Sequence, residues 1–181
     1  MRYSQIRSMD ISNGRGIGVA LFVQGCHFHC QGCFNQETWD FDGGKEWTQD
    51  VEERFLRLVN RPYIKRISIL GGEPLADENK DAVFAIIEHI RRRYPGKEIW
   101  LYTGYLWDDI YINNRFDLTK RLIAANCDYV VDGRFELSKQ DLYNEKIVFA
   151  GSTNQRIIDV RKTLESGNIV CLKTKECTND K

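Results

Sequence analysis

The stretch Cys26-His27-Phe28-His29-Cys30-Gln31-Gly32-Cys33 comes soon after an apolar run, Val19-Ala20-Leu21-Phe22-Val23. The run has the length and composition of a buried strand, so the cysteines are expected on the loop where that strand ends. Three thiols so close together cannot bridge one another without leaving one over, and neighbours two or three residues apart converge readily on one centre. The octet therefore predicts a metal site rather than a disulfide.

The octet alone leaves two kinds of metal site equally open. Zinc would take the three thiolates and either His27 or His29 in a tetrahedral set. A [4Fe-4S] cluster would take one thiolate per iron, and three cysteines would leave the fourth iron open to a substrate. The two histidines are expected equally as loop residues and as ligands, so we assign ligand roles only to the three thiols, Cys26, Cys30 and Cys33.

The composition is that of an ordinary globular chain of 181 residues, with 42% hydrophobic and 29% charged residues. Twenty-six basic residues balance twenty-six acidic ones, so no overall charge favours nucleic acid or an anionic membrane as a partner. Neither a signal peptide nor a transmembrane helix is expected. The remaining cysteines, Cys127, Cys171 and Cys177, are too scattered for a secreted-disulfide pattern. This cysteine usage favours the cytoplasm.

Strand and helix patterns alternate through the middle of the chain. A helix capped by Thr48 is followed by predicted strands at 65–70, 98–102 and 128–133, which are separated by predicted helices at 77–94 and 118–125. Strands joined by helical crossovers predict a parallel sheet whose ligand-binding turns share one edge. A complete eight-unit barrel takes about 250 residues. We therefore expect an α/β fold, a partial, open (β/α) barrel of about five to six units with a mostly parallel sheet.

The two ends of the chain fit this alternation less well. Residues 1–10 show no apolar core segment, and 10–18 form a glycine-rich approach to the first predicted strand. Near the C-terminus the candidate strands are 146–150 and 156–160, with a further short strand near 169–172. Cys127 is expected to be a small buried hydrophobe, and Cys171 and Cys177 to be free thiols.

The pattern Cys-x3-Cys-x2-Cys resembles the cluster loop of the radical S-adenosylmethionine (SAM) enzymes. With Phe34-Asn35 after it, the loop is similar to that of the activating enzymes of anaerobic ribonucleotide reductases. In this subgroup the aromatic residue stands after the third cysteine, as Phe34 does here, and this chain has Gly32 before that cysteine. Three further segments also resemble this subgroup: Trp100-Leu101-Tyr102-Thr103-Gly104-Tyr105, Val131-Asp132-Gly133 and Gly151-Ser152-Thr153-Asn154-Gln155-Arg156. We treat 1–181 as a single radical SAM domain. The resemblance covers about 10–161, and the tail 162–181 is unassigned.

The resemblance implies two cofactors, a [4Fe-4S] cluster held by Cys26, Cys30 and Cys33, and SAM. Main-chain groups of the turn Gly71-Gly72-Glu73 would bind the methionine amino group, while Gly32, Cys33 and Phe34 would border the adenosine and the sulfonium. A side chain at Gly72 is expected to weaken SAM binding and to leave the cluster in place. Thr103 and Asp132 lie at strand ends, where ligand contact and buried turn-capping are equally expected.

The implied reaction is the activation of a class III ribonucleotide reductase. The reduced cluster would cleave SAM to a 5′-deoxyadenosyl radical, which would take hydrogen from a glycine of the reductase and leave a glycyl radical. The implied partners are the large reductase subunit and a one-electron reductant such as flavodoxin or ferredoxin. The alternatives are an activase of another glycyl-radical enzyme, a small-molecule radical SAM enzyme and a zinc-stabilised interaction module.

Overall fold

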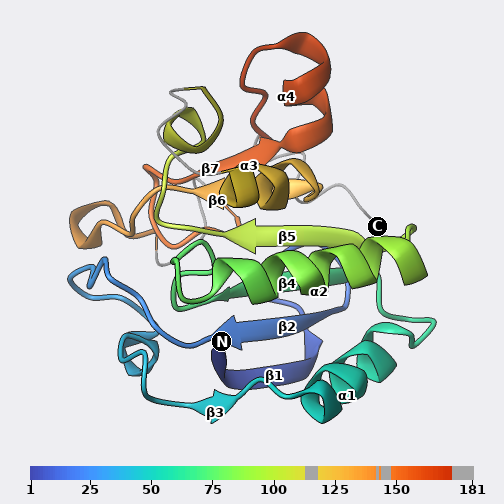
Figure 1. The fold of residues 1–181 in the computed structure, drawn as a ribbon. Helices are drawn as coiled ribbons and strands as arrows, with labels where there is room; N and C mark the ends of the chain where they lie inside the picture. Colours follow the sequence, from blue (N-terminus) through green and yellow to red (C-terminus); the bar gives the residue numbers. More distant parts are fainter. Residues whose placement is uncertain (113–117, 142, 144–147, 173–181) are drawn as a thin grey trace.

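The computed structural model describes residues 1–112, 118–141, 143 and 148–172. Within them one seven-stranded sheet forms the centre of the molecule, with the strand order β3-β1-β2-β4-β5-β6-β7 (Figure 1). In chain order the strands are β1 (Arg2–Asp10), β2 (Gly18–Val23), β3 (Lys45–Glu46), β4 (Arg66–Gly71), β5 (Glu98–Tyr102), β6 (Tyr129–Asp132) and β7 (Arg156–Asp159). The predicted α/β class is confirmed, and the sheet is open rather than closed on itself.

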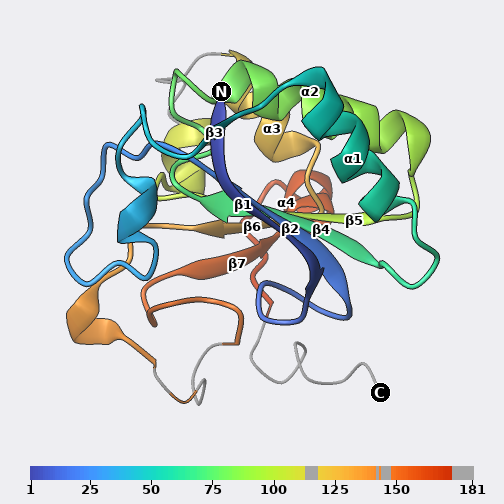
Figure 2. The same ribbon diagram turned by 90° about the horizontal axis from the view of Figure 1, so that it is seen from below.

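The middle of the sheet is parallel, as the alternating pattern predicts. Strands β2, β4, β5 and β6 pair in parallel, and the helices that connect them are α1 (Gln49–Val59), α2 (Lys80–Arg93) and α3 (Leu118–Ala125). Figure 2 shows these helices together on one face of the sheet. Thr48 caps α1 as expected, because its side chain accepts a hydrogen bond from the backbone N–H of Val51. Parallel strands ending at one edge bring their following turns together.

The edges of the sheet correct the prediction of a mostly parallel sheet of five to six units. Strand β1 pairs antiparallel with both β2 and β3, and β7 pairs antiparallel with β6, so the described residues contain three helical crossovers. The sequence pattern missed β1, because only Tyr3 and Asp10 of that strand are buried and no apolar alternation marks it. A strand buried mainly through its pairing with a neighbour leaves little hydrophobic signal.

The segments after β6 also differ in part from expectation. Residues 146 and 147 of the predicted strand 146–150 lie outside the described residues, and 148–150 are not a strand. Strand β7 matches the predicted strand 156–160, but Val160 already begins the helix α4 (Val160–Ser166), which the pattern missed. Near the expected strand at 169–172 there is a single antiparallel bridge between Cys171 and Ile158.

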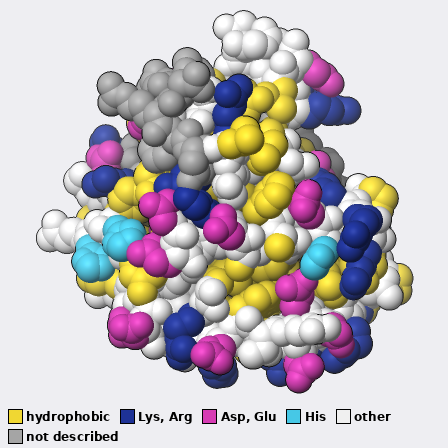
Figure 3. Space-filling view, viewed as in Figure 1, with side chains coloured by type: hydrophobic (Ala, Val, Ile, Leu, Met, Phe, Trp, Pro, Cys, Tyr) yellow, Lys and Arg dark blue, Asp and Glu magenta, His cyan; other side chains and the backbone are white. Residues whose placement is uncertain are grey.

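The core lies between the helices and the sheet. The apolar stripe of α2 is fully buried there and consists of Val83, Ile86, Ile87 and Ile90. The opposite face of the sheet carries a smaller group, Ala20, Phe22 and Leu70, with Tyr102 packed beside it. On the helix-bearing side, Figure 3 shows positive and negative side chains interspersed over the surface, in keeping with the balanced composition.

Candidate active site

The loops that follow the parallel strands meet at one edge of the sheet. Val23 at the end of β2 lies beside Gly71 at the end of β4, and Tyr102 at the end of β5 lies beside Val131 of β6. In Figure 1 the arrowheads of β2 and β5 point to the side where the segments after β2 and β6 lie. A cavity of about 690 Å³ opens at this edge and continues across the sheet face that the helices do not cover.

The three clustered cysteines line this cavity together. Cys26, Cys30 and Cys33 are half-buried, unbridged thiols. Two backbone hydrogen bonds tie the start of their loop to the segment after it, from Gly25 N to Thr38 O at 2.8 Å and from Cys26 N to Trp39 O at 3.0 Å. A third, from Cys33 N to Cys30 O at 3.0 Å, folds the last two cysteines toward one another. The fold therefore presents the thiols to one shared space.

The two histidines of the loop are occupied elsewhere. The Nε2 atom of His27 lies 3.1 Å from a carboxylate oxygen of Glu78, and the ring of His29 stacks on that of Trp39 with 4.7 Å between centroids. Neither histidine is among the described residues that line the cavity. The described residues also contain no set of three His, Cys, Asp or Glu side chains placed to share one metal ion. This arrangement does not support the Cys3His zinc set.

The thiols fit a polynuclear cluster, in which each iron takes its own thiolate and the sulfur atoms need not converge on one point. Burial raises the pKa of the Cys26 thiol to about 11, and it also raises the pKa of Cys30. These thiols hold their protons until a metal replaces them. The backbone N–H of Asn35 already donates to the Cys33 sulfur at 3.4 Å.

The Gly-Gly-Glu turn after β4 lies against the start of the cysteine loop. Gly72 N donates to Val23 O at 2.9 Å, and Glu73 N donates to Gly25 O at 2.7 Å. A Cβ at Gly72 would overlap the carbonyl oxygen of Gly25 and lie 3.0 Å from its nitrogen. The glycine is therefore needed where two backbones cross. We revise the expectation that a side chain at Gly72 would spare the cluster, because it would first displace the residue before Cys26.

The carboxylate of Glu73 is fully buried and joins the turn after β4 to the turn after β5. It accepts hydrogen bonds of 2.8 Å from Leu75 N, from the Thr103 hydroxyl and from Gly104 N. Burial raises the pKa of this carboxyl group to about 7. Thr103 thus holds a buried turn, which is one of the two roles expected for it. Glu73 lines the cavity, but its side chain is engaged by the protein's own donors.

Phe28 locks the cysteine loop onto the β5 turn, a role that the sequence did not indicate. A Cβ at Gly104 would overlap the Phe28 ring. That ring also packs edge-on against Tyr105 at 4.9 Å and lies 4.4 Å beneath the Arg134 guanidinium. An aromatic residue between two cysteines gives no hint of this partner, because Gly104 is distant in sequence.

The two other residues assigned to the SAM site differ in their placement. Phe34 lines the cavity with 63% of its surface exposed, and its ring lies 5.2 Å from that of Phe135. Gly32 has a φ of +74°, and a Cβ there would lie 2.8 Å from Leu137. Gly32 is not among the described residues that line the cavity. It sets the backbone path between Cys30 and Cys33.

The Asn-Gln-Arg stretch closes the side of the cavity beyond β6. The amide oxygen of Gln155 accepts from Gly151 N at 2.8 Å, and its amide nitrogen donates to Gly133 O at 2.9 Å. Arg156 forms ion pairs with Asp132 and Asp108. Asp132 is fully buried and also accepts from Trp107 N, so it holds a turn. These side chains position the loops around the cavity.

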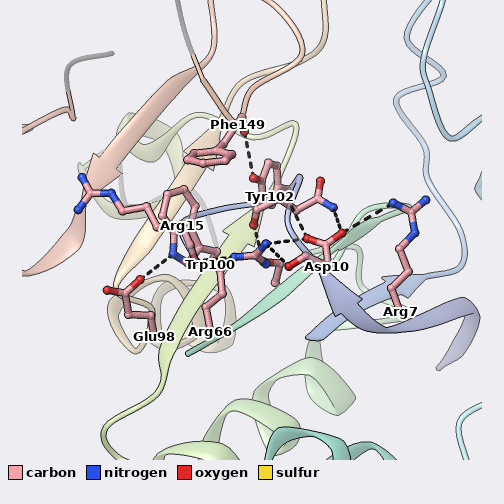
Figure 4. Close-up of polar contacts among 10 residues, drawn as sticks. Arg7, Asp10, Arg15, Arg66, Glu98, Trp100, Tyr102 and Phe149 are labelled. Carbon is pink, nitrogen blue, oxygen red and sulfur yellow. Dashed lines mark hydrogen bonds and ion pairs between the residues drawn. The ribbon is translucent and has the colours of Figure 1, made fainter. Parts of the chain in front are cut away.

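A buried polar network lies at the far end of the cavity from the cysteines. Figure 4 shows Arg66 and Asp10 joined on the open face of the sheet. The Arg66 guanidinium is 2.7 Å from the Asp10 carboxylate and also donates to Ser68 at 2.6 Å and to Arg15 O at 3.0 Å. Asp10 also accepts from Asn13 N, and Asn13 lines the cavity. Residues 11–13 of the glycine-rich segment line one wall of the cavity, and these contacts hold them there.

The remaining described cysteines lie apart from the cavity. Cys127 is buried, burial raises the pKa of its thiol, and its sulfur donates to Ile123 O at 3.2 Å. It behaves as the buried hydrophobe that the sequence predicts. Cys171 is exposed, and Cys177 lies outside the described residues. In the part of the chain that the structure describes, no helix has the length and apolarity to cross a membrane.

Comparison with known proteins agrees with this geometry. Residues 12–158 match the family described as a 4Fe-4S single cluster domain. The chain is 34% identical over 163 residues to the anaerobic ribonucleoside-triphosphate reductase-activating proteins of Salmonella typhi and Escherichia coli K12, covering 89% of this chain and 100% of each relative. It is 32% identical to the protein of that name from Enterobacteria phage T4, over 87% of this chain and 93% of the relative. The chain therefore belongs to the 4Fe-4S single cluster domain family and to the family of anaerobic ribonucleoside-triphosphate reductase-activating proteins.

Proposed function

We propose that this protein is a radical SAM oxidoreductase that activates an anaerobic (class III) ribonucleotide reductase, with a [4Fe-4S] cluster and SAM as its cofactors. The observation that carries the proposal is the placing of three half-buried thiols around one cavity, beside the Gly-Gly-Glu turn. The names of its relatives supply the reductase as the target. When held by these residues, the cluster and SAM would supply the one-electron chemistry by which a hydrogen atom is taken from a glycine of the reductase, which leaves a glycyl radical there.

The protein's own part is to hold the cluster and to orient SAM beside it. Cys26, Cys30 and Cys33 would each give one thiolate to the cluster and leave one iron for SAM. The raised thiol pKa values mean that cluster binding releases protons to solvent. Hydrogen bonds from Gly25 N to Thr38 O and from Cys26 N to Trp39 O hold the start of the cysteine loop in place.

The SAM site is proposed at the turns that border the thiols. Main-chain groups of Gly71 and Gly72 are proposed to bind the methionine amino group, while Glu73 sets the shape of that turn through the donors that its carboxylate binds. Gly32, Cys33 and Phe34 are proposed to border the adenosine and sulfonium, with Phe34 offering an exposed aromatic face.

The partner must reach into the cavity, because its glycine is part of a protein. Exposed apolar side chains lie beside the cysteine loop and the 133–137 segment, namely Phe34, Leu106 and Leu137. We infer that the large reductase subunit contacts them, and that the open sheet face acts as the inner wall of a partial barrel. We also propose that the electron donor is a flavodoxin or ferredoxin. The proposed location is the cytoplasm, and residues 1–181 are proposed to form a single domain.

The test is anaerobic reconstitution followed by assays for iron, SAM cleavage and radical formation. With SAM and a one-electron reductant, the wild type should form methionine and 5′-deoxyadenosine, and with its reductase it should give a glycine radical in electron paramagnetic resonance spectra. Cys30→Ala should lose iron and both activities, whereas Cys127→Ala, the matched control, should keep its iron. Normal iron in Cys30→Ala would refute the ligand set. If a radical formed in a different glycyl-radical enzyme but not in the reductase, the assignment of the reductase as the partner would be refuted.

A further inference from the structure

Arg134 brings a positive charge to the cysteine loop from a distant part of the chain. It comes just after β6, and its exposed side chain lines the same cavity as the three thiols. Its guanidinium lies 4.4 Å from the centre of the Phe28 ring. Because Phe28 stands between Cys26 and Cys30, the charge lies over the segment that carries these thiols. None of the proposed cluster and SAM contacts uses this side chain.

The protein fixes both the backbone at Arg134 and the ring on which its charge lies. Asn154 Nδ2 donates to Arg134 O at 2.8 Å, which ties this segment to the loop before β7. The Phe28 ring fills the space where a Cβ of Gly104 would be, so the β5 turn holds it from another side. The position of the guanidinium therefore follows from contacts between three separate segments.

The Arg134 charge is not neutralised by the protein. Among the described residues, two cations line the cavity, Arg7 and Arg134. Arg7 lies 3.8 Å from the Asp10 carboxylate, whereas no carboxylate in the described part of the chain forms an ion pair with Arg134. The Arg134 charge is therefore left to act on what the cavity holds.

The charge is close enough to act on Cys30. Burial raises the pKa of the Cys30 thiol, whereas the backbone N–H of Phe135 and the Arg134 guanidinium lower it. Both of these groups favour negative charge on the sulfur. A cluster that takes up one electron gains a further negative charge, and nearby charges are among the factors that set the potential of an iron–sulfur cluster.

We propose that the Arg134 charge, held on the Phe28 ring beside Cys30, stabilises the reduced state of the bound cluster and so raises its reduction potential. The electron itself comes from the one-electron donor of the proposed function, and Arg134 acts through its field without reacting. Water and salt screen an exposed charge, so the effect is modest and depends on ionic strength. This inference rests on the proposed function, because it requires a [4Fe-4S] cluster at the three thiols.

The test compares Arg134→Met and Arg134→Lys with the wild type. Methionine removes the charge and keeps a flexible side chain against the Phe28 ring, whereas lysine keeps the charge. Arg92→Met is the matched control, because it removes the same charge from the exposed end of α2, away from the cavity lining. Iron content is measured first. The cluster potential is then measured without SAM, by a redox titration followed by electron paramagnetic resonance, and SAM affinity is measured by calorimetry.

The titration is done at about 10 mM and at about 1 M ionic strength, where the Debye length is about 30 Å and about 3 Å. At the lower value, the one-electron reduction equilibrium of Arg134→Met should fall roughly threefold to fivefold, or about 28–41 mV at 59 mV per tenfold change. The difference from the wild type should shrink at the higher value. Arg134→Lys and Arg92→Met should keep the wild-type potential.

An unchanged potential in iron-loaded Arg134→Met would overturn the proposal. This includes the outcome in which only SAM affinity falls, since Arg134 would then act on SAM rather than on the cluster. An equal shift in Arg134→Lys, or a shift that salt does not reduce, would indicate altered packing and would also overturn it.

Where Arg134→Met does not load with iron, Arg134→Gln takes its place. Loss of iron in Arg134→Lys as well as in both neutral variants would show a structural role and overturn the proposal. Iron loading in Arg134→Lys but in neither neutral variant would support an action of the charge on the cluster. These outcomes differ from failure of the proposed function, in which the wild type itself would bind no cluster or cleave no SAM.

Discussion

Replacing Gly72 by alanine should damage the cysteine loop before it affects SAM. The added Cβ would overlap Gly25 O and lie 3.0 Å from both the carbonyl carbon and the nitrogen of Gly25. Gly25 cannot easily retreat, since its N–H is bonded to Thr38 and its carbonyl to Glu73 N, and the Phe41 ring occupies the space where its own Cβ would be. The residue that would have to move is the one before Cys26.

The magnitude follows from overpacking against a fixed backbone, which costs about 1–3 kcal/mol, and from each hydrogen bond that Gly25 would lose, about 0.5–1.5 kcal/mol. We expect Gly72→Ala to lower the free energy of unfolding by roughly 2–4 kcal/mol. Urea unfolding of the reduced, iron-free protein measures this, and iron content after reconstitution should fall in parallel.

Gly96→Ala is the matched control, because a Cβ at Gly96 meets nothing within 4 Å. Its stability should stay within about 0.5 kcal/mol of the wild type. Wild-type stability and full iron loading in Gly72→Ala, with only SAM binding weakened, would refute the backbone-crossing argument. The glycine would then be required by the ligand.

Three further predictions concern buried contacts. Glu73 has a raised pKa in the folded protein, about 7, so the native state keeps a proton that the unfolded chain releases earlier. Relative to Glu73→Gln, the free energy of unfolding of the wild type should therefore fall as pH rises from about 4.5 to about 7, by up to about 3 kcal/mol. Urea unfolding of both proteins across this pH range measures the difference. Free energies that change in parallel would contradict the prediction. Asp10→Leu should lower the free energy of unfolding by about 3–5 kcal/mol, because it leaves the Arg66 charge buried without its carboxylate. Adding Arg66→Met should recover part of that loss. No recovery would count against the Asp10–Arg66 ion pair as the source of the loss. Gly104→Ala should lower stability by about 1–3 kcal/mol through its overlap with Phe28, and a double-mutant cycle with Phe28→Ala should show coupling rather than additivity.

The sequence alone determined the features that depend on local pattern. The apolar run 19–23, the Thr48 cap and the stripe of α2 each form the predicted element, since burial of one face and satisfaction of helix ends are local requirements. The spacing of Cys26, Cys30 and Cys33 was enough to predict that the thiols share one site, because residues so near in sequence must lie close in space. The composition of β1 held no such pattern, and that strand was missed.

Only the tertiary structure decided how the site is held together. Gly72 crosses Gly25, Glu73 binds the β5 turn, and Phe28 lies against Gly104, all through contacts between segments far apart in the chain. The antiparallel placing of β7 and the position of the Arg134 guanidinium over Phe28 likewise depend on neighbours brought close by folding. A local pattern can report which face of a segment is apolar, but steric fit and the presence or absence of a hydrogen-bond partner exist only once distant segments are packed together.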